Sequence, residues 1–132
     1  MSDELARKIL SEYETWAVVG WSPSPHRDSN RIAAFLERHG KRVVRVNPNA
    51  CGDDPLCVAS LADLPEPVEV VDLFRRSSEV GPHVDEAIEV GARAVWMQLG
   101  VVDPAAAARA EEAGLDVVMD RCPAIDWPRL MG

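Results

Sequence analysis

Short apolar runs alternate with amphipathic stretches along almost the whole chain. Each apolar run is closed by glycine, asparagine or another polar residue, which is the pattern of a buried β-strand. The stretches between the runs carry apolar residues three or four positions apart, which is typical of helices that pack on one face. The predicted strands are 15–20, 42–46, 68–74, 94–99 and 115–119.

Start and stop signals place helices between these strands. A short polar residue such as Ser29 precedes a helical stretch, and a glycine such as Gly40 follows it. Residues 50–67 are predicted to be irregular apart from a helical turn near 60–64, and the chain is predicted to end in a short helical tail. The predicted helices are 3–13, 29–39, 78–90 and 104–114.

This alternation predicts an α/β fold. Strands joined by right-handed helical crossovers form a single Rossmann-like, doubly wound parallel sheet, here of about five strands in the order 3-2-1-4-5, with helices on both faces. One domain over residues 1–132 is expected, with an N-terminal helix over 1–13 and a core over 14–130. Ligands of such sheets bind outside the carboxyl ends of the strands, at the switch between the first and fourth strands.

Composition narrows the class of protein. Hydrophobic residues make up 47% of the chain, enough for a sizeable core. The net charge of −8 argues against nucleic acid or an anionic membrane as a partner. No apolar run approaches the roughly 18 residues that span a bilayer, and the start lacks a signal-peptide apolar region, so a cytoplasmic location is expected.

Cysteines and histidines supply no obvious catalytic centre. Cys51, Cys57 and Cys122 are odd in number and lack a framework spacing, which argues against a disulfide scaffold. Their spacing is not that of a zinc site, so no metal is expected. With no nucleophile–base pair and no P-loop in the sequence, no catalytic residue is assigned.

The loop after the first strand has features of an anion site. Gly20 allows close backbone approach, and the helix that follows offers unpaired N–H groups to an anion. Ser22, Ser29 and Asn30 are short hydrogen-bonding side chains, and Arg27 suits a phosphate. The alternative is a proline-rich connection with a capping serine.

Arginines mark the next two strand ends. Arg45 lies inside a valine-rich strand, where a buried cation needs an anionic partner such as the phosphorylated ribose of NADP or coenzyme A. The alternative is a side chain that faces solvent. Arg75 and Arg76 end the third strand and suit phosphate, or else form salt bridges with Glu79 or Asp85.

Two further residues stand out. Cys122 at the last strand end has Arg121 beside it, a neighbour that favours a reactive thiol, although a lone cysteine is more often a small buried residue. Asp72 is an acid within an apolar strand and is expected to hydrogen-bond a neighbouring loop.

Several segments together resemble the stand-alone CoA-binding domain family of bacteria. They are AVVGWSPSPHRDSNRIAAFLERHG, VVRVNPN, VVDLFRR, AVWMQLGVVD and DVVMDRCP, which occur in the family's order over residues 15–130. The family's fold is similar to the CoA-binding half of the succinyl-CoA synthetase α subunit. The resemblance implies coenzyme A as the ligand, bound across the carboxyl ends of the strands.

The resemblance also implies positions for parts of the ligand. The first loop takes the phosphate-bearing portion, and the second strand end borders the adenosine. The third strand end lines the nucleotide cleft, the fourth borders the pantetheine, and the fifth lies toward the thiol. The expected ligand-binding residues are Gly20, Trp21, Ser22, Arg27, Ser29, Asn30, Arg45, Asn47, Pro48, Phe74, Arg75, Arg76, Gln98, Leu99, Gly100 and Cys122. The synthetases use a phosphorylated histidine in a second domain that has no match here, so the ligase reaction is not expected.

The sequence therefore predicts a non-catalytic module that binds coenzyme A or an acyl-CoA. Three alternatives stay open: an NADP-dependent oxidoreductase, a thiol that exchanges with coenzyme A through Cys122, and an interaction domain without a ligand. The expected partner is a small molecule. A homodimer through an apolar sheet edge, or an unknown protein partner, is also open.

Overall fold

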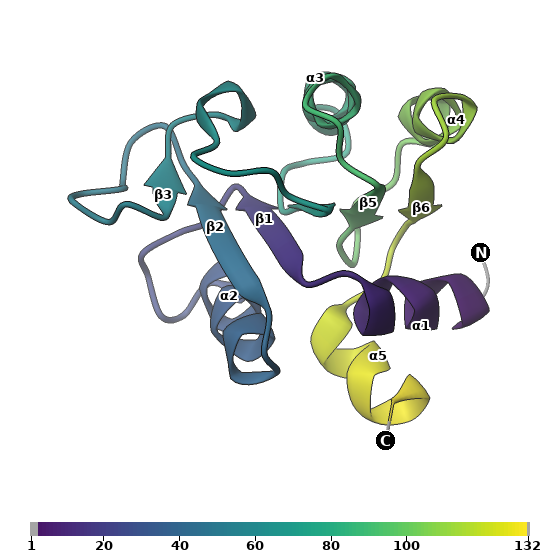
Figure 1. Ribbon diagram of the computed structural model, residues 1–132, viewed down its shortest axis with the longest axis horizontal. Helices are drawn as coiled ribbons and strands as arrows, with labels where there is room; N and C mark the ends of the chain where they lie inside the picture. The colour runs from purple at the N-terminus through teal and green to yellow at the C-terminus, as the bar shows by residue number, and fades with distance from the viewer. Residues whose placement is uncertain (1–2, 132) are drawn as a thin grey trace.

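A parallel sheet runs through the centre of the protein. The computed structural model describes residues 3–131, and within them the sheet has six strands in the order β3-β2-β1-β4-β5-β6 (Figure 1). All neighbouring strands pair in parallel, so their carboxyl ends meet at one edge. The strands are β1 (Thr15–Val19), β2 (Arg42–Val46), β3 (Cys57–Val58), β4 (Val70–Leu73), β5 (Ala94–Met97) and β6 (Asp116–Val118).

Helices cover both faces of the sheet. The first face carries α1 (Asp3–Glu12), α2 (Asp28–Arg38) and α5 (Pro123–Leu130). The other carries the 3₁₀ helix η1 (Leu61–Asp63), α3 (Val80–Glu89) and α4 (Pro104–Glu112). Figure 1 shows these two layers, with α1 and α5 side by side.

Successive strand residues feed the two halves of the core. In β1, Ala17 faces the α3 side and Val18 the α2 side, as strand geometry requires. The largest core side chains, Trp16 and Trp96, lie on the α2 side with ring centroids 5.8 Å apart. The Nε1–H group of Trp96 donates to the carbonyl of Arg121 over 2.9 Å, which ties the loop after β6 to the sheet.

The predicted fold class is confirmed, but the sheet has six strands where about five were predicted, and one predicted strand pairs with a different neighbour. The additional strand, β3, has only two residues and no periodic signal, so its segment was predicted to be irregular. It takes the edge beside β2, and the order 3-2-1-4-5 holds only when β3 is counted as the third strand. The segment 68–74, counted third from the sequence, instead pairs with β1 through Val70–Leu73.

The number and spacing of the cysteines argue against a disulfide scaffold, but the structure contains one disulfide. A disulfide joins Cys51 to Cys57 and closes the loop that leads into β3, while Cys122 is free. Sequence spacing alone did not show it because the loop must first turn back on itself at Gly52, which has φ +59°.

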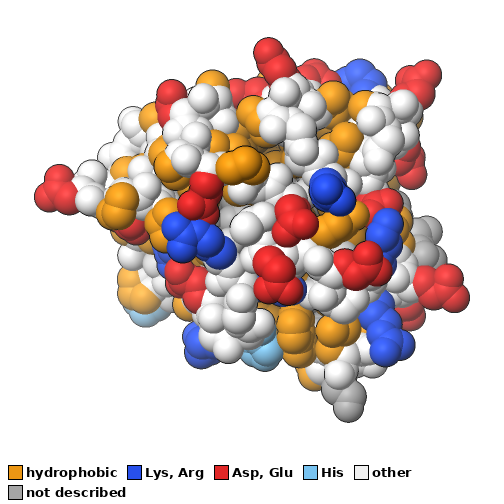
Figure 2. Space-filling model, viewed as in Figure 1, with side chains coloured by type: hydrophobic (Ala, Val, Ile, Leu, Met, Phe, Trp, Pro, Cys, Tyr) orange, Lys and Arg blue, Asp and Glu red, His pale blue; other side chains and the backbone are white. Residues whose placement is uncertain are grey.

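The surface carries charges of both signs. Figure 2 shows acidic and basic side chains intermixed over the visible face, consistent with the net charge of −8. Among the helices formed by residues 3–131, none has the length and apolar character needed to cross a membrane.

Asp72 is buried at the centre of the sheet. It lies in β4 between Val18 and Trp96 and has no exposed surface. Neither carboxyl oxygen has a hydrogen-bond partner among residues 3–131, so the predicted bond to a loop is not formed. Burial raises the pKa of Asp72 well above its ordinary value, because an unpaired charge in an apolar core is unfavourable.

We expect Asp72→Val to stabilise the protein by about 1–3 kcal/mol at neutral pH, because it removes an unsatisfied buried polar group. In the unfolded chain Asp72 ionises near pH ~3.9, whereas the folded state holds its proton to higher pH. The unfolded state then binds fewer protons, so the free energy of unfolding falls as pH rises above about 4.

Urea unfolding from about pH 4 to about pH 8 measures both effects. The variant should be more stable and should lose less stability as the pH rises, while Asp53→Val in an exposed loop should leave the pH dependence unchanged. A less stable Asp72→Val protein with the original pH dependence would contradict the assignment.

Candidate functional site

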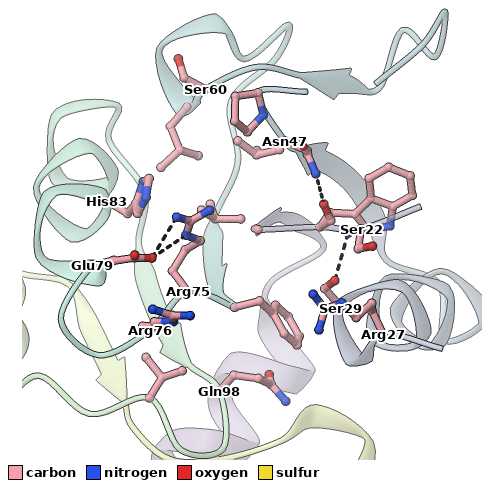
Figure 3. A pocket seen from close by; sticks show the side chains of 18 of the residues that line it. Ser22, Arg27, Ser29, Asn47, Ser60, Arg75, Arg76, Glu79, His83 and Gln98 are labelled. Carbon is pink, nitrogen blue, oxygen red and sulfur yellow. Dashed lines mark hydrogen bonds and ion pairs between the residues drawn. The ribbon is translucent and has the colours of Figure 1, made fainter. Parts of the chain in front are cut away.

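An open cleft of about 970 Å³ lies at the carboxyl ends of β1, β2, β4 and β5 (Figure 3). The chain leaves β1 for α2 on one face and leaves β4 for α3 on the other, and the cleft opens between these two connections. The predicted residues that line it are Gly20, Trp21, Ser22, Arg27, Ser29, Asn47, Pro48, Phe74, Arg75, Arg76, Gln98 and Leu99.

Gly20 forms the floor where β1 ends. Its φ is +84°, and a Cβ there would lie 3.0 Å from the carbonyl oxygen of Phe74 and 3.1 Å from Cδ of Arg75. The N–H groups of Gly20 and Trp21 both donate to the carbonyl of Val46, over 3.1 and 3.3 Å. The loop therefore crosses between its two neighbouring strands at very close range, which requires glycine.

Polar side chains hold the first loop against the start of α2. The Ser22 N–H donates to Ser29 Oγ and the Asn30 amide donates to the Ser22 carbonyl, each over 3.0 Å. Asn47 donates its side-chain amide to the Trp21 carbonyl. Ser29, Asn30 and Asn47 thus make internal bonds that shape the loop.

The helix start itself is left without a cap. Arg27 occupies the N-cap position of α2 and makes no side-chain capping bond. The first N–H groups of a helix have no acceptor within it and form its positive end. An anion in the cleft beside Ser22 and Ser29 would meet these groups.

Three arginines line the cleft, and they differ in their partners. Arg75 is paired with Glu79, its Nη2 and Nε atoms 2.9 and 3.2 Å from Oε2. Arg27 and Arg76 are exposed, and neither side chain forms an ion pair or hydrogen bond with any residue from 3 to 131. Figure 3 places these two arginines on opposite sides of the opening, so each can bind an added anion.

The acidic groups of the cleft are already engaged. Glu79 accepts from Arg75, Glu86 bonds His83 over 3.1 Å, and Asp28 pairs with Arg31. Arg27 and Arg76 have no carboxylate partner among residues 3–131, whereas Glu86 is the one acidic group of these three that is not paired with an arginine, so the net charge around the opening is positive although the whole chain is acidic.

Two residues that line the cleft each carry a buried polar atom without a partner within residues 3–131. These atoms are Nε1 of Trp21 and Oε1 of Gln98, and the Gln98 side chain belongs to a residue only 6% exposed. Buried donors and acceptors are nearly always satisfied in proteins, so such a pair at a cleft marks groups that a ligand or water bonds.

A second, smaller cavity of about 190 Å³ adjoins the cleft. It shares Asp28, Gln98 and Leu99 with the cleft, and Cys122 and Ile125 also line it. Cys122 is partly exposed and holds the N-cap position of α5. The predicted Cys122 thus lies beside the cleft without lining it.

Three other predicted residues do not line the cleft. Arg45 forms two bonds to Glu37 of α2, 2.7 and 3.1 Å long, and its guanidinium lies 5.6 Å from the centroid of the Trp21 ring. The anion that a strand arginine needs is therefore supplied by the protein itself. Asn30 braces the loop, and Gly100 receives a bond from Ser77 and donates to Asp120.

One wall of the cleft, formed by η1 and α3, was not predicted from the sequence. Ser60, Leu61, Glu79 and His83 all line the cleft. Ser60 and Leu61 belong to a segment that reads as irregular apart from a helical turn, and His83 lies within a predicted helix. Glu79 was expected only as a salt-bridge partner of Arg75, which it is. Only the position of β4 beside β1 brings α3 over the opening.

The chain is similar to a known family, to a relative of similar length and to several solved structures. A family described as a CoA binding domain matches residues 14–128. The Bacillus subtilis (strain 168) protein YneT is 33% identical over 119 residues, which cover 88% of this chain and 87% of YneT. A solved structure from Pyrococcus horikoshii OT3 has 39% identity and a TM-score of 0.91, covering 100% of this chain and 94% of that one. One from Thermus thermophilus has 37% identity and a TM-score of 0.89, covering 98% and 99%.

We expect Gly20→Ala to destabilise the protein more than Gly40→Ala does. Both glycines have a positive φ, +84° and +86°, so both variants bear the left-handed conformational cost of about 1–2 kcal/mol. A Cβ at Gly40 meets nothing within 4 Å, whereas one at Gly20 presses on the Phe74 carbonyl and adds about 1–3 kcal/mol. Equal losses in denaturant unfolding would show that the floor of the cleft is not tightly packed.

Proposed function

The chain belongs to the CoA-binding domain family, and we propose that it is a single-domain protein that binds coenzyme A or an acyl-CoA in the cleft at the carboxyl ends of its strands. The observation that carries the proposal is a pair of arginines without side-chain partners among residues 3–131, Arg27 at the uncapped start of α2 and Arg76 on the opposite side of the cleft. Coenzyme A brings the complementary groups, since it joins several phosphates to an adenosine and to a long amide-containing arm that ends in a thiol.

The phosphates suit the middle of the cleft. The free N–H groups at the start of α2 and the Arg27 guanidinium form an anion site on one side. Arg76 supplies a second cation on the other side, and planar guanidinium groups bind phosphate oxygens bidentately. Gly20 keeps the floor free of side chains, so a bulky phosphate can approach the backbone.

The adenosine suits the end near β2 and η1. Asn47, Pro48, Ser60 and Leu61 there combine an apolar surface with hydrogen-bonding groups. Trp21 adds an aromatic ring whose Nε1–H lacks an acceptor within residues 3–131. We assign Arg45 a positioning role, because it lies over the Trp21 ring while held by Glu37.

The amide arm suits the opposite end. Phe74 and Leu99 offer apolar contact, and Gln98 presents a buried carbonyl oxygen without a donor. An amide N–H of the arm would satisfy that oxygen. A buried acceptor left without a donor costs about 1–3 kcal/mol, so filling it favours a ligand with amides at this point.

The groups that line the cleft are those that bind and do not suggest a reaction, so we propose binding as the activity. The alternative hypothesis of an NADP-dependent oxidoreductase rested on Arg45 as the partner of a ribose phosphate. Because Arg45 is paired with Glu37, that argument loses its support.

Isothermal titration of the purified protein with coenzyme A, NADPH and ATP tests the proposal. We expect coenzyme A to bind and NADPH to bind much more weakly or not at all. Arg76→Ala and Arg27→Ala should each weaken coenzyme A binding by roughly 10–100-fold, the value of one charge-assisted hydrogen bond. Arg38→Ala removes an equal charge from the far end of α2 and should leave the affinity unchanged.

Salt provides a second readout. Adding salt should weaken the wild-type affinity more than that of Arg76→Ala, since one screened charge pair is missing. Tight NADPH binding without coenzyme A binding, or full affinity in both arginine variants, would contradict the proposed function.

A further inference from the structure

The small cavity continues the cleft beyond Gln98. The two cavities share Asp28, Gln98 and Leu99, and the smaller one has Cys122 on its wall. Figure 3 shows Gln98 at the end of the cleft opposite Ser60. A long ligand that lies along the cleft therefore points its far end toward Cys122.

Gln98 is a second observation that points to a ligand in the passage, by which we mean the region where the cleft and the small cavity meet. The main-chain groups of Gln98 are satisfied, since its N–H donates to Leu73 and its carbonyl accepts from Val101. The residue lines both cavities, and its buried side-chain oxygen has no donor among residues 3–131. An acceptor without a donor in the described chain, the Gln98 side-chain oxygen, therefore belongs to a residue that lines the same small cavity as Cys122.

The walls of the small cavity suit a small uncharged tail. Ile32, Leu99 and Ile125 supply apolar surface, and the last two are large side chains left 53% and 55% exposed. Asp28 and Arg31 pair with each other, so neither leaves a free charge there. A thiol or thioester end fits such walls better than a phosphate does.

We propose that Cys122 captures the thiol end of the ligand as a mixed disulfide. The inference rests on the proposed function, because the cleft must first hold the nucleotide part of the ligand. Cys122 is the free cysteine of the chain, and the other two are already joined to each other near β3. The reacting partner is a small disulfide that contains the ligand.

The exchange balances without an external oxidant. The Cys122 thiolate attacks the ligand sulfur of the disulfide, and a new sulfur–sulfur bond forms as the old one breaks. The second sulfur leaves as a thiolate and takes up the proton that Cys122 released. One disulfide is consumed and one is made, and the protein becomes a reversible carrier of the ligand thiol.

The test is to incubate the protein with coenzyme A disulfide and to follow its intact mass. We expect one adduct whose mass is that of coenzyme A less two hydrogen atoms, located by peptide mapping on Cys122 and removed by dithiothreitol. Cys122→Ser should give no adduct. Glutathione disulfide has the same reactive bond without the nucleotide. It should react at least roughly tenfold more slowly than coenzyme A disulfide, because only a bound disulfide is held near the thiol.

Competition connects the reaction to the cleft. Desulfo-coenzyme A, which lacks the thiol, should slow adduct formation in the wild-type protein, and Arg76→Ala should slow it as well. Equal rates with the two disulfides, or an adduct on Cys51 or Cys57, would overturn the proposal.

A separate titration of the wild-type protein with desulfo-coenzyme A distinguishes the two levels of failure. Binding without any Cys122 adduct overturns the capture site and leaves the proposed function standing. Absence of both binding and adduct overturns the proposed function, and the capture site with it.

Discussion

The parallel pairing of β1 with both β2 and β4 is the constraint on which the rest of the structure depends. Because β1 and β4 are parallel neighbours, and the chain leaves β1 for one face and β4 for the other, the two connections diverge at the carboxyl ends of the strands. The cleft is the space between them. Gly20 makes this junction feasible, since its backbone bonds Val46 while passing within contact of Phe74.

Acidic side chains of the protein neutralise some of the arginines in and beside the cleft and leave others without a partner in the described chain. Arg45 has Glu37 as its acidic partner within the chain, and Arg75 has Glu79. These pairs position loops and the Trp21 ring, and they cancel the local charge. Arg27 and Arg76 remain without partners in the described chain, so a positive opening exists on an acidic protein. Attraction of an anion is thereby confined to one place.

Buried side-chain oxygens without a hydrogen-bond donor in the described chain lie on two neighbouring strands, in β4 and directly after β5. Asp72 in β4 and Gln98 just after β5 both carry side-chain oxygens without donors among residues 3–131. They differ in position, because Asp72 is sealed within the sheet whereas Gln98 lies where the cleft and the small cavity meet. A ligand can satisfy Gln98, and Asp72 is accommodated by keeping its proton. The passage past Gln98 gives the proposed ligand a direction, from the phosphates toward Cys122.

The sequence by itself determined the α/β class, nearly all of the strands and helices, and the loops that line the cleft. Periodicity and capping signals are local, and parallel strands bring their carboxyl ends together whatever their order. Tertiary structure decided what depends on distant neighbours: β3 at the edge, β4 beside β1, and the Cys51–Cys57 disulfide. It also decided which arginines are free, because Glu37 and Glu79 reach Arg45 and Arg75 only in the folded chain. A charged side chain is visible in a sequence, but its partner is a matter of three-dimensional proximity.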